Sequence, residues 1–225
     1  MLLQVYPRIK ASIIVLLFFL LVVLFILISI NLFGMAFRKL GFPPEYSIYF
    51  LFFSLLGGYV NIPVKKVISR VPVISGQKID YLFFSYTSSP KEIKDNTIIA
   101  INLGGAVIPV IMSVFLSIKV SLVDALIGIL VMTILIHKMA RPKKGSGIAI
   151  HALLPPILAT AMALIISPQN APVIAYVSGT LGCLIGIDIL NLKRIPEMGV
   201  PVVSIGGAGT FDAIFLTGII SVLLA

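Results

Sequence analysis

Long apolar runs separated by short polar connections dominate the chain. A membrane-spanning helix needs about 20 consecutive, mostly apolar residues, and seven runs come near that length. They cover residues 11–33, 45–61, 97–118, 121–137, 147–166, 172–191 and 201–225. The pattern predicts an all-α integral membrane protein, with residues 1–225 forming one polytopic domain of about seven transmembrane helices.

The basic residues between these runs predict an orientation. If seven helices alternate in direction, 14 of the 17 Lys and Arg residues fall on the same side as the N-terminus. The other side holds only Arg38, Lys39 and Lys119. Cytoplasmic connections carry the excess of Lys and Arg in membrane proteins. The sequence therefore predicts a multi-pass cell-membrane protein with its N-terminus in the cytoplasm and its C-terminus outside.

One connection, residues 62–96, is much longer than the others. Pro63, Pro72 and Gly76 prevent it from forming one long helix. It is too apolar for a disordered segment, which lacks the hydrophobic residues needed for burial. We expect this loop, between the second and third helices, to pack against the cytoplasmic face.

Composition excludes several other classes of protein. Hydrophobic residues make up 59% of the chain and charged residues 11%, against about 25% charged residues in soluble domains. The net charge of +9 is spread over the connections rather than along a basic stripe with aromatics, so no nucleic-acid partner is predicted. The single cysteine, Cys183, allows no disulfide framework. No zinc-ligand or nucleotide motif is present, so no metal or cofactor is predicted.

Two aspartates fall inside apolar runs, where ionisable residues are costly and mark functional sites. Asp188 lies sixteen residues into the sixth run and Asp212 lies thirteen residues before the end of the seventh. At 1.5 Å per residue, they lie about 24 and about 20 Å below the outer face. Because adjacent helices pack about 8–10 Å apart, their carboxylates could meet and share a proton or a cation.

A glycine-rich run precedes the second aspartate. Gly206, Gly207 and Gly209 are poor helix formers, so we expect an unwound entry and a helix that restarts near Thr210 or Phe211. Thr210 would then be the N-cap and would place Asp212 in the first turn. The helix dipole stabilises an acid there, which is a purely structural alternative for Asp212.

Asp188 has no such local explanation. It lies near the C-terminal end of its helix, where the dipole disfavours an anion. It therefore needs a shared proton, a bound cation, or a basic partner such as Lys193 or Arg194.

Further polar residues are predicted on the same cytoplasmic half. Asn102 opens the third helix, and His151 precedes a pair of prolines, 155 and 156, that should kink the fifth. Broken helices around a polar centre are typical of transporters. We include Asn102 and His151, with the two aspartates, the three glycines 206, 207 and 209, and Thr210, as candidate residues for binding an ion or a solute.

The C-terminal run SIGGAGTFDAIFLTG, at residues 204–218, resembles the hallmark of an uncharacterised family of prokaryotic multi-pass membrane proteins. The runs GIDILNL at 186–192 and GYVNIP at 58–63 fit the same pattern. This resemblance covers nearly the whole chain. It implies a fold and a membrane location but no activity, because the family is defined as a domain of unknown function.

A looser resemblance links the two aspartates to intramembrane aspartyl proteases of the presenilin and prepilin-peptidase type. Those enzymes use one aspartate on each of two helices, the second after a Gly-x-Gly run. The resemblance implies Asp188 and Asp212 as a catalytic dyad that shares one proton and activates water. Here two extra residues separate Gly209 from Asp212, and the Pro-Ala-Leu motif of presenilins is absent.

Three functional hypotheses follow, and whether the chain is an enzyme stays open. The most specific is a small ion-coupled transporter in which Asp188 and Asp212 bind a proton or cation that accompanies a small solute. The second is the intramembrane aspartyl protease. The third is a membrane scaffold or accessory protein, with the lipid bilayer as its partner. The sequence does not specify an oligomeric state.

Overall fold

The computed structural model describes residues 11–74, 79–81, 84–86, 93–143 and 147–225. Seven α-helices occur in this part of the chain: α1 (Ala11–Lys39), α2 (Tyr46–Gly57), α3 (Ile108–Ser117), α4 (Leu122–Met139), α5 (Leu154–Ile166), α6 (Ala171–Cys183) and α7 (Phe211–Leu224). Short π or 3-10 segments are η1 (Leu103–Val107), η2 (Pro168–Asn170), η3 (Leu184–Asp188) and η4 (Ile189–Glu197). The strands are β1 (Asn61–Ile74), β2 (Ile79–Tyr81), β3 (Phe84–Tyr86), β4 (Ile93–Asn102), β5 (Arg141–Lys143), β6 (Gly147–Ala149) and β7 (Val202–Ile205).

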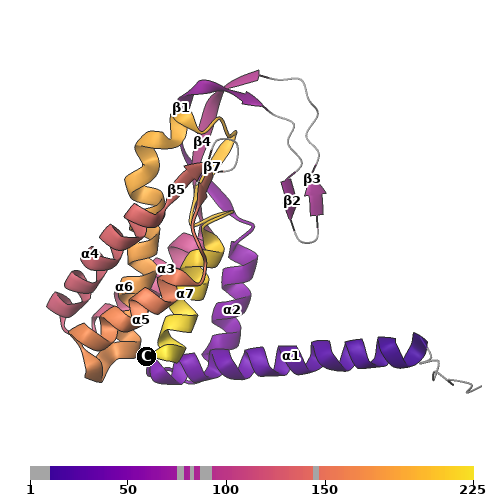
Figure 1. Cartoon of the computed structure of the whole chain (residues 1–225), viewed down its shortest axis with the longest axis vertical. Helices are drawn as coiled ribbons and strands as arrows, with labels where there is room; N and C mark the ends of the chain where they lie inside the picture. Colours follow the sequence, from indigo (N-terminus) through magenta and orange to yellow (C-terminus); the bar gives the residue numbers. More distant parts are fainter. Residues whose placement is uncertain (1–10, 75–78, 82–83, 87–92, 144–146) are drawn as a thin grey trace, which may run out of the picture.

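A small sheet sits at one end of the helices α2 to α7 (Figure 1). Its strand order is β1-β4-β7. Strands β1 and β4 are antiparallel, whereas β4 and β7 are parallel, with Ile101 opposite Ile205. Each strand connects to a helix at the same end of the sheet. Strand β1 follows α2, strand β4 leads into η1 and α3, and strand β7 leads into α7. This end of the sheet is therefore the junction between sheet and helices.

The sheet corrects the all-α prediction. Three of the four apolar runs that were expected to enter the membrane from the cytoplasmic side begin with a strand: 97–118 with β4, 147–166 with β6 and 201–225 with β7. Their first residues are rich in Ile and Val, which favour strands, and Pro201 and Gly206 bound β7. Hydropathy alone does not separate a buried strand from a buried helix.

The long connection between the second and third predicted helices is also structured. Strands β1 and β4 are its two arms, and they pair from Asn61 opposite Asn102 to Ile74 opposite Ile93. Between these arms lies the short hairpin of β2 and β3. In the residues that the structure describes, the connection is therefore a β-ribbon.

Two expectations about helix starts have different outcomes. Helix α7 begins at Phe211 with Thr210 as its N-cap residue and Asp212 in its first turn, which confirms the predicted restart. The predicted proline kink in α5 is wrong. Pro155 and Pro156 lie in the first turn of α5, where the missing proline N–H would have no intrahelical acceptor.

Three helical segments are long and apolar enough to cross a membrane: Val15–Lys39, Leu122–Met139 and Pro168–Glu197. The other four apolar helices are shorter. Helix α2, with 12 residues, rises only about 18 Å, and α7, with 14 residues, about 21 Å. The apolar helices are those of a membrane protein, whereas seven complete spans remain a prediction.

Helix α6 is the centre of the bundle. Its apolar segment is 78% buried, whereas that of α1 is 0% buried. Glycines on α6 allow the neighbouring helices to approach closely. A Cβ at Gly182 would lie 2.5 Å from the Cβ of Met132 on α4, and one at Gly179 would lie 2.7 Å from a methyl of Thr217 on α7. Small residues serve the same purpose in membrane helix packing generally.

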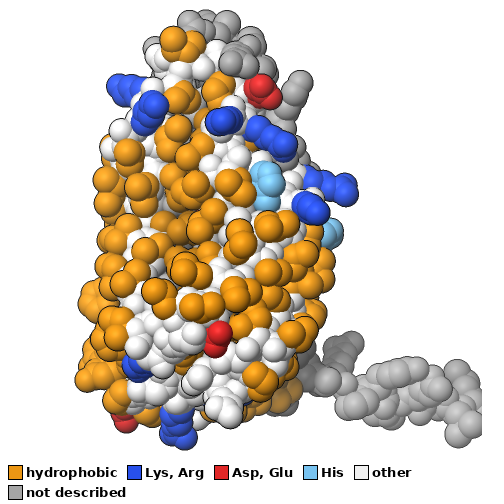
Figure 2. All heavy atoms as spheres, turned by 90° about the vertical axis from the view of Figure 1, so that its left-hand side faces the viewer, with side chains coloured by type: hydrophobic (Ala, Val, Ile, Leu, Met, Phe, Trp, Pro, Cys, Tyr) orange, Lys and Arg blue, Asp and Glu red, His pale blue; other side chains and the backbone are white. Residues whose placement is uncertain are grey.

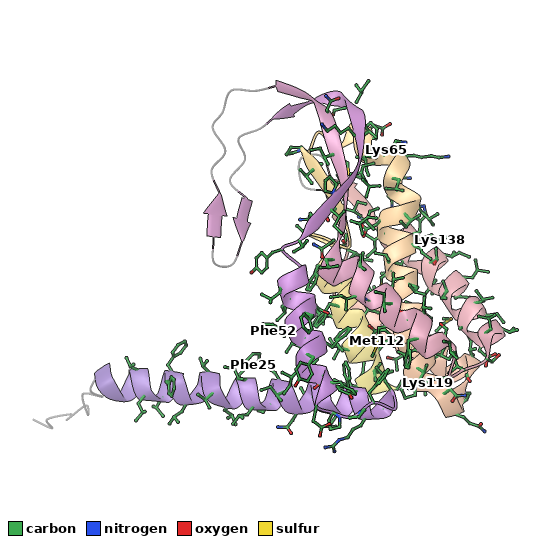
Figure 3. All side chains as sticks on the ribbon, turned by 180° about the vertical axis from the view of Figure 1, so that it is seen from behind. Phe25, Phe52, Lys65, Met112, Lys119 and Lys138 are labelled. Carbon is green, nitrogen blue, oxygen red and sulfur yellow. The ribbon has the colours of Figure 1, made fainter. Side chains whose placement is uncertain are left out.

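The surface is apolar around the middle of the bundle and charged towards its ends. The face in Figure 2 shows hydrophobic side chains over the middle and most of its Lys, Arg and His side chains towards the sheet end. Lys65 and Lys138 lie at the sheet end, whereas Lys119 lies near the opposite end (Figure 3). In the predicted orientation, the sheet end is the cytoplasmic one.

Candidate functional site

Three glycine-containing segments meet at the junction between sheet and helices. They are Gly57 at the end of α2, Gly104 and Gly105 in η1, and Gly206 after β7. A Cβ on Gly104 would lie 2.0 Å from the carbonyl oxygen of Ser54, and one on Gly105 would lie 2.0 Å from the carbonyl oxygen of Gly206. Any side chain would push these backbones apart, so glycine is required for their contact.

Asn102 links these segments through its side chain. It is fully buried, and its Nδ2 donates to the carbonyl of Gly58 at 2.7 Å and to Oδ1 of Asn61 at 3.0 Å. Its Oδ1 accepts the N–H of Gly105 at 2.8 Å, which caps η1. The hydroxyl of Ser204 on β7 also donates to Oδ1 of Asn61. These contacts use the polar atoms of Asn102 to hold the junction together, and its role as a ligand residue stays a prediction.

Asp188 contacts the same junction from the last position of the π segment η3. Its side chain is only 5% exposed. Oδ2 accepts the backbone N–H of Gly206 at 2.6 Å and the hydroxyl of Thr210 at 3.2 Å. Gly206 can present its N–H here because it has a φ of +70°, which side chains rarely allow. The end of the α6 region is thereby bonded to the unwound segment before α7.

Asp188 has no basic partner among the residues that the structure describes. Lys193 and Arg194 are the nearest cations along the chain, but both are exposed, and neither forms an ion pair there. An ionised carboxylate has about four acceptor positions, and two donors fill only part of them. A buried charge with so few donors is costly, and proton or cation binding would remove that cost.

The second aspartate has different surroundings. Asp212 is exposed in the first turn of α7, where the helix dipole favours an acid. No hydrogen bond joins it to Asp188 within the described part of the chain. Thr210 lies between them: its hydroxyl contacts Asp188, and Asp212 follows two residues later. The direct sharing of a proton by the two aspartates stays a prediction.

The other residues that were predicted to bind an ion or a solute are Gly207, Gly209 and His151. Gly207 and Gly209 belong to the unwound segment, and Gly209 has a φ of +93°. The carbonyl of Gly207 accepts the N–H of Phe211 at 2.7 Å, which turns the chain into α7. His151 is exposed between β6 and α5, and no contact brings its ring to Asp188.

Sequence reasoning missed a polar contact on the other side of η3. Nδ1 of His137, on α4, lies 3.1 Å from the carbonyl of Gly186. Because a carbonyl can only accept, Nδ1 donates to it in the tautomer that carries the proton there; Nδ1 also lies 3.4 Å from Nδ2 of Asn191. Asn191 donates to the carbonyls of Gly186 and Ile187, at 3.2 and 2.8 Å. These donors satisfy carbonyls in the π segment, and the only signal in the sequence is an amide four residues after Ile187.

The amide of Asn191 is incompletely satisfied. Its Oδ1 is buried and has no hydrogen-bond partner. Exchanging the amide oxygen and nitrogen would place the oxygen against two carbonyls, so the orientation is fixed by the network. This unused acceptor lies one helical turn beyond Asp188.

Comparison with known proteins identifies a family without an assigned activity. The model of a family described as "Protein of unknown function (DUF1614)" matches residues 55–224. No curated protein and no solved structure matches the chain. The comparisons therefore give no support to the resemblance to aspartyl proteases.

Proposed function

We propose a function from the geometry, because the chain belongs to the DUF1614 family of proteins of unknown function. The proposed function is that of a multi-pass cell-membrane carrier that couples proton or cation binding at Asp188 to the movement of a small solute. The observation that carries this proposal is the buried Asp188 carboxylate, which has a backbone N–H and a hydroxyl as partners but no described cation.

The position of Asp188 favours a coupling role. Its carboxylate joins two pieces of non-helical backbone, the π segment η3 and the unwound segment before α7. Irregular backbone at membrane depth is tolerated where it is buried in protein or lines a cavity, and carriers place their ion sites at such breaks. Isolated π segments also occur frequently at functional sites.

Proton binding would change the bond that holds the two segments together. The charged carboxylate is a strong acceptor for the Gly206 N–H. Protonation removes the charge and turns one carboxyl oxygen into a donor, which weakens that bond. The unwound segment and α7 would then be freer to move relative to α6. Binding and release of one proton would thus bias two arrangements of the same helices.

Asp212 fits this scheme as a relay rather than as an equal partner. It is exposed, and it lies two residues beyond Thr210, the hydroxyl donor to Asp188. An exposed carboxylate there would collect protons for the buried one. Gly206, Gly207 and Gly209 would supply the backbone freedom that the movement requires.

The test uses the full-length chain in proteoliposomes that enclose a pH-sensitive dye. A potassium gradient with valinomycin drives proton entry, with and without each member of a panel of amino acids, sugars and organic acids outside. We expect solute-dependent proton uptake that Asp188→Asn abolishes and Asp212→Asn slows. The control Asp124→Asn removes an acid at the opposite end of the bundle and should leave the rate unchanged.

Two results would reject the proposal. Solute-dependent uptake that survives in Asp188→Asn would show that another group carries the proton. A folded protein with no uptake for any solute would favour the scaffold hypothesis, in which Asp188 only binds the turn at Gly206. No observation favours the protease, because the two aspartates differ in burial and share no described hydrogen bond.

A further inference from the structure

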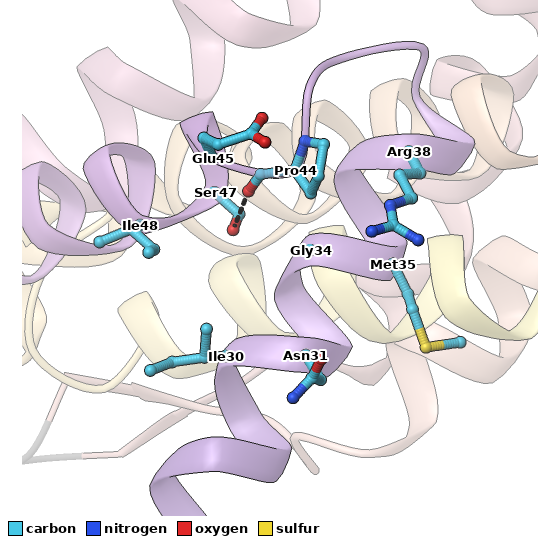
Figure 4. A pocket seen from close by; sticks show the side chains of 9 residues that line it. All are labelled: Ile30, Asn31, Gly34, Met35, Arg38, Pro44, Glu45, Ser47 and Ile48. Carbon is cyan, nitrogen blue, oxygen red and sulfur yellow. Dashed lines mark hydrogen bonds between the residues drawn. The ribbon is translucent and has the colours of Figure 1, made fainter.

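A crevice opens between α1 and the start of α2, at the end of the bundle opposite the sheet (Figure 4). Its volume is about 240 Å³, which is below the roughly 300–1,000 Å³ of pockets for drug-sized ligands. Gly34 lines the crevice. The two helices approach each other there, because a Cβ at Gly34 would lie 3.3 Å from Cβ of Pro44. The site therefore suits a small polar group rather than a whole organic substrate.

Two opposite charges line this crevice. Arg38 comes from the last turns of α1, and Glu45 precedes the first turn of α2. Both side chains are exposed, and neither forms an ion pair with any residue that the structure describes. An unpaired guanidinium and an unpaired carboxylate on the walls of one crevice are complementary to a zwitterion.

Apolar surface continues from the edge of the crevice. Ile30 and Ile48 line it on the α1 and α2 sides, and they are 38% and 51% exposed. Exposed apolar side chains follow from there along both helices, including Leu27 on α1 and Phe52 on α2. A ligand with a polar head and two hydrocarbon chains would match both the charges and this surface.

We propose that the crevice binds the headgroup of a zwitterionic phospholipid with a primary amine, of the phosphatidylethanolamine type. Arg38 would bind the phosphate, since guanidinium matches phosphate geometry with two parallel hydrogen bonds. Glu45 would accept hydrogen bonds from the ammonium group. The acyl chains would lie along the exposed apolar face of α2, because α1 extends sideways from the bundle (Figure 1). This inference does not depend on the proposed carrier function.

The lining also discriminates between headgroups. A choline group has no N–H to donate and is recognised by aromatic cages, but the residues around the crevice include no aromatic side chain. An anionic headgroup without an amine, such as glycerol phosphate, would leave Glu45 unpaired beside the phosphate. The geometry therefore favours ethanolamine over both choline and glycerol headgroups.

Native mass spectrometry of the detergent-solubilised full-length chain tests the proposal. Phosphatidylethanolamine, phosphatidylcholine and phosphatidylglycerol with the same acyl chains are added one at a time at equal concentration. We expect retention of the ethanolamine lipid and about tenfold weaker retention in Arg38→Gln and in Glu45→Gln, as loss of one charged hydrogen-bonded contact implies. Lys193→Gln and Asp124→Asn are the charge-matched controls and should bind as the wild type does.

Several outcomes would overturn the inference. Equal retention of the ethanolamine and choline lipids, or a preference for phosphatidylglycerol that depends on Arg38 alone, would exclude amine recognition. Unchanged retention in both variants would place the lipid elsewhere. Free phosphoethanolamine that binds as tightly as the lipid would show that a soluble zwitterion is the ligand. Thermal unfolding midpoints equal to the wild type confirm that any loss is not caused by misfolding.

Discussion

Gly105→Ala tests the contact between η1 and the unwound segment most sharply. The new Cβ would lie 2.0 Å from the carbonyl oxygen of Gly206 and 2.7 Å from Cδ2 of Phe211. Ordinary contact begins near 3.4 Å, so the two backbones must separate by about 1.4 Å. A shift of that size at Gly206 would disrupt the geometry of the 2.6 Å hydrogen bond between its N–H and Asp188.

The expected cost has two parts. Overpacking costs about 1–3 kcal/mol, and a hydrogen bond to a charged group contributes about 1.5–3 kcal/mol. These effects are coupled, so we expect a loss of about 3 kcal/mol or more in the free energy of unfolding. That is a large share of the roughly 5–15 kcal/mol of a typical protein.

The chain carries its own reporter for this measurement. Cys183 is its single cysteine, and it is fully buried in the bundle. A thiol-reactive fluorescent dye will therefore label the protein only as it unfolds on heating in detergent. Gly34→Ala is the matched control, because its Cβ would lie 3.3 Å from one neighbouring atom and the change favours the helix. If Gly105→Ala unfolds at the same temperature as Gly34→Ala, the backbones at Gly105 and Gly206 do not approach each other as closely as described.

Three further predictions test the junction and the orientation. Thr210→Val keeps the shape of the side chain but removes the hydroxyl that contacts Asp188, and should cost about 1 kcal/mol in the same thiol-labelling assay; no loss would show that this contact contributes nothing. Asn102→Ala removes the cap of η1 and the bond to the Gly58 carbonyl, and should cost about 2–4 kcal/mol, whereas a cost below that of Thr210→Val would contradict its linking role. In intact cells, a membrane-impermeant maleimide should label Asp124→Cys but not Lys193→Cys, and the reverse pattern would invert the proposed orientation.

The sequence predicted the local start of α7 because its signal is local. Glycines at 206, 207 and 209 disfavour a helix whatever surrounds them, and Thr210 and Asp212 are residues that helix starts prefer. The sheet was missed for the opposite reason. The second half of β4 and the whole of β7 are mostly apolar and could equally extend the helices after them, and only their pairing in the sheet identifies them as strands.

The partners of Asp188 were also beyond local reasoning. Its position near a helix end indicated that it needs a partner, but the candidates were Asp212 and the nearby basic residues. The structure supplies the N–H of Gly206 instead. That donor is available because the chain turns at the end of β7 and because Gly105 lets the two backbones touch. The π segment η3, which determines where the carboxylate points, has no periodic signature in the sequence.

The most direct test of the central claim is the infrared carboxyl signal of the reconstituted protein. Difference spectra between acidic and alkaline buffer report carboxyl groups that gain or lose a proton. If Asp188 is the coupling group, the wild type will show, beside the bands of the exposed carboxyl groups, a protonated-carboxyl component that is lost in Asp188→Asn and kept in Asp212→Asn. A difference spectrum that Asp188→Asn leaves unchanged would contradict a proton-binding role for Asp188.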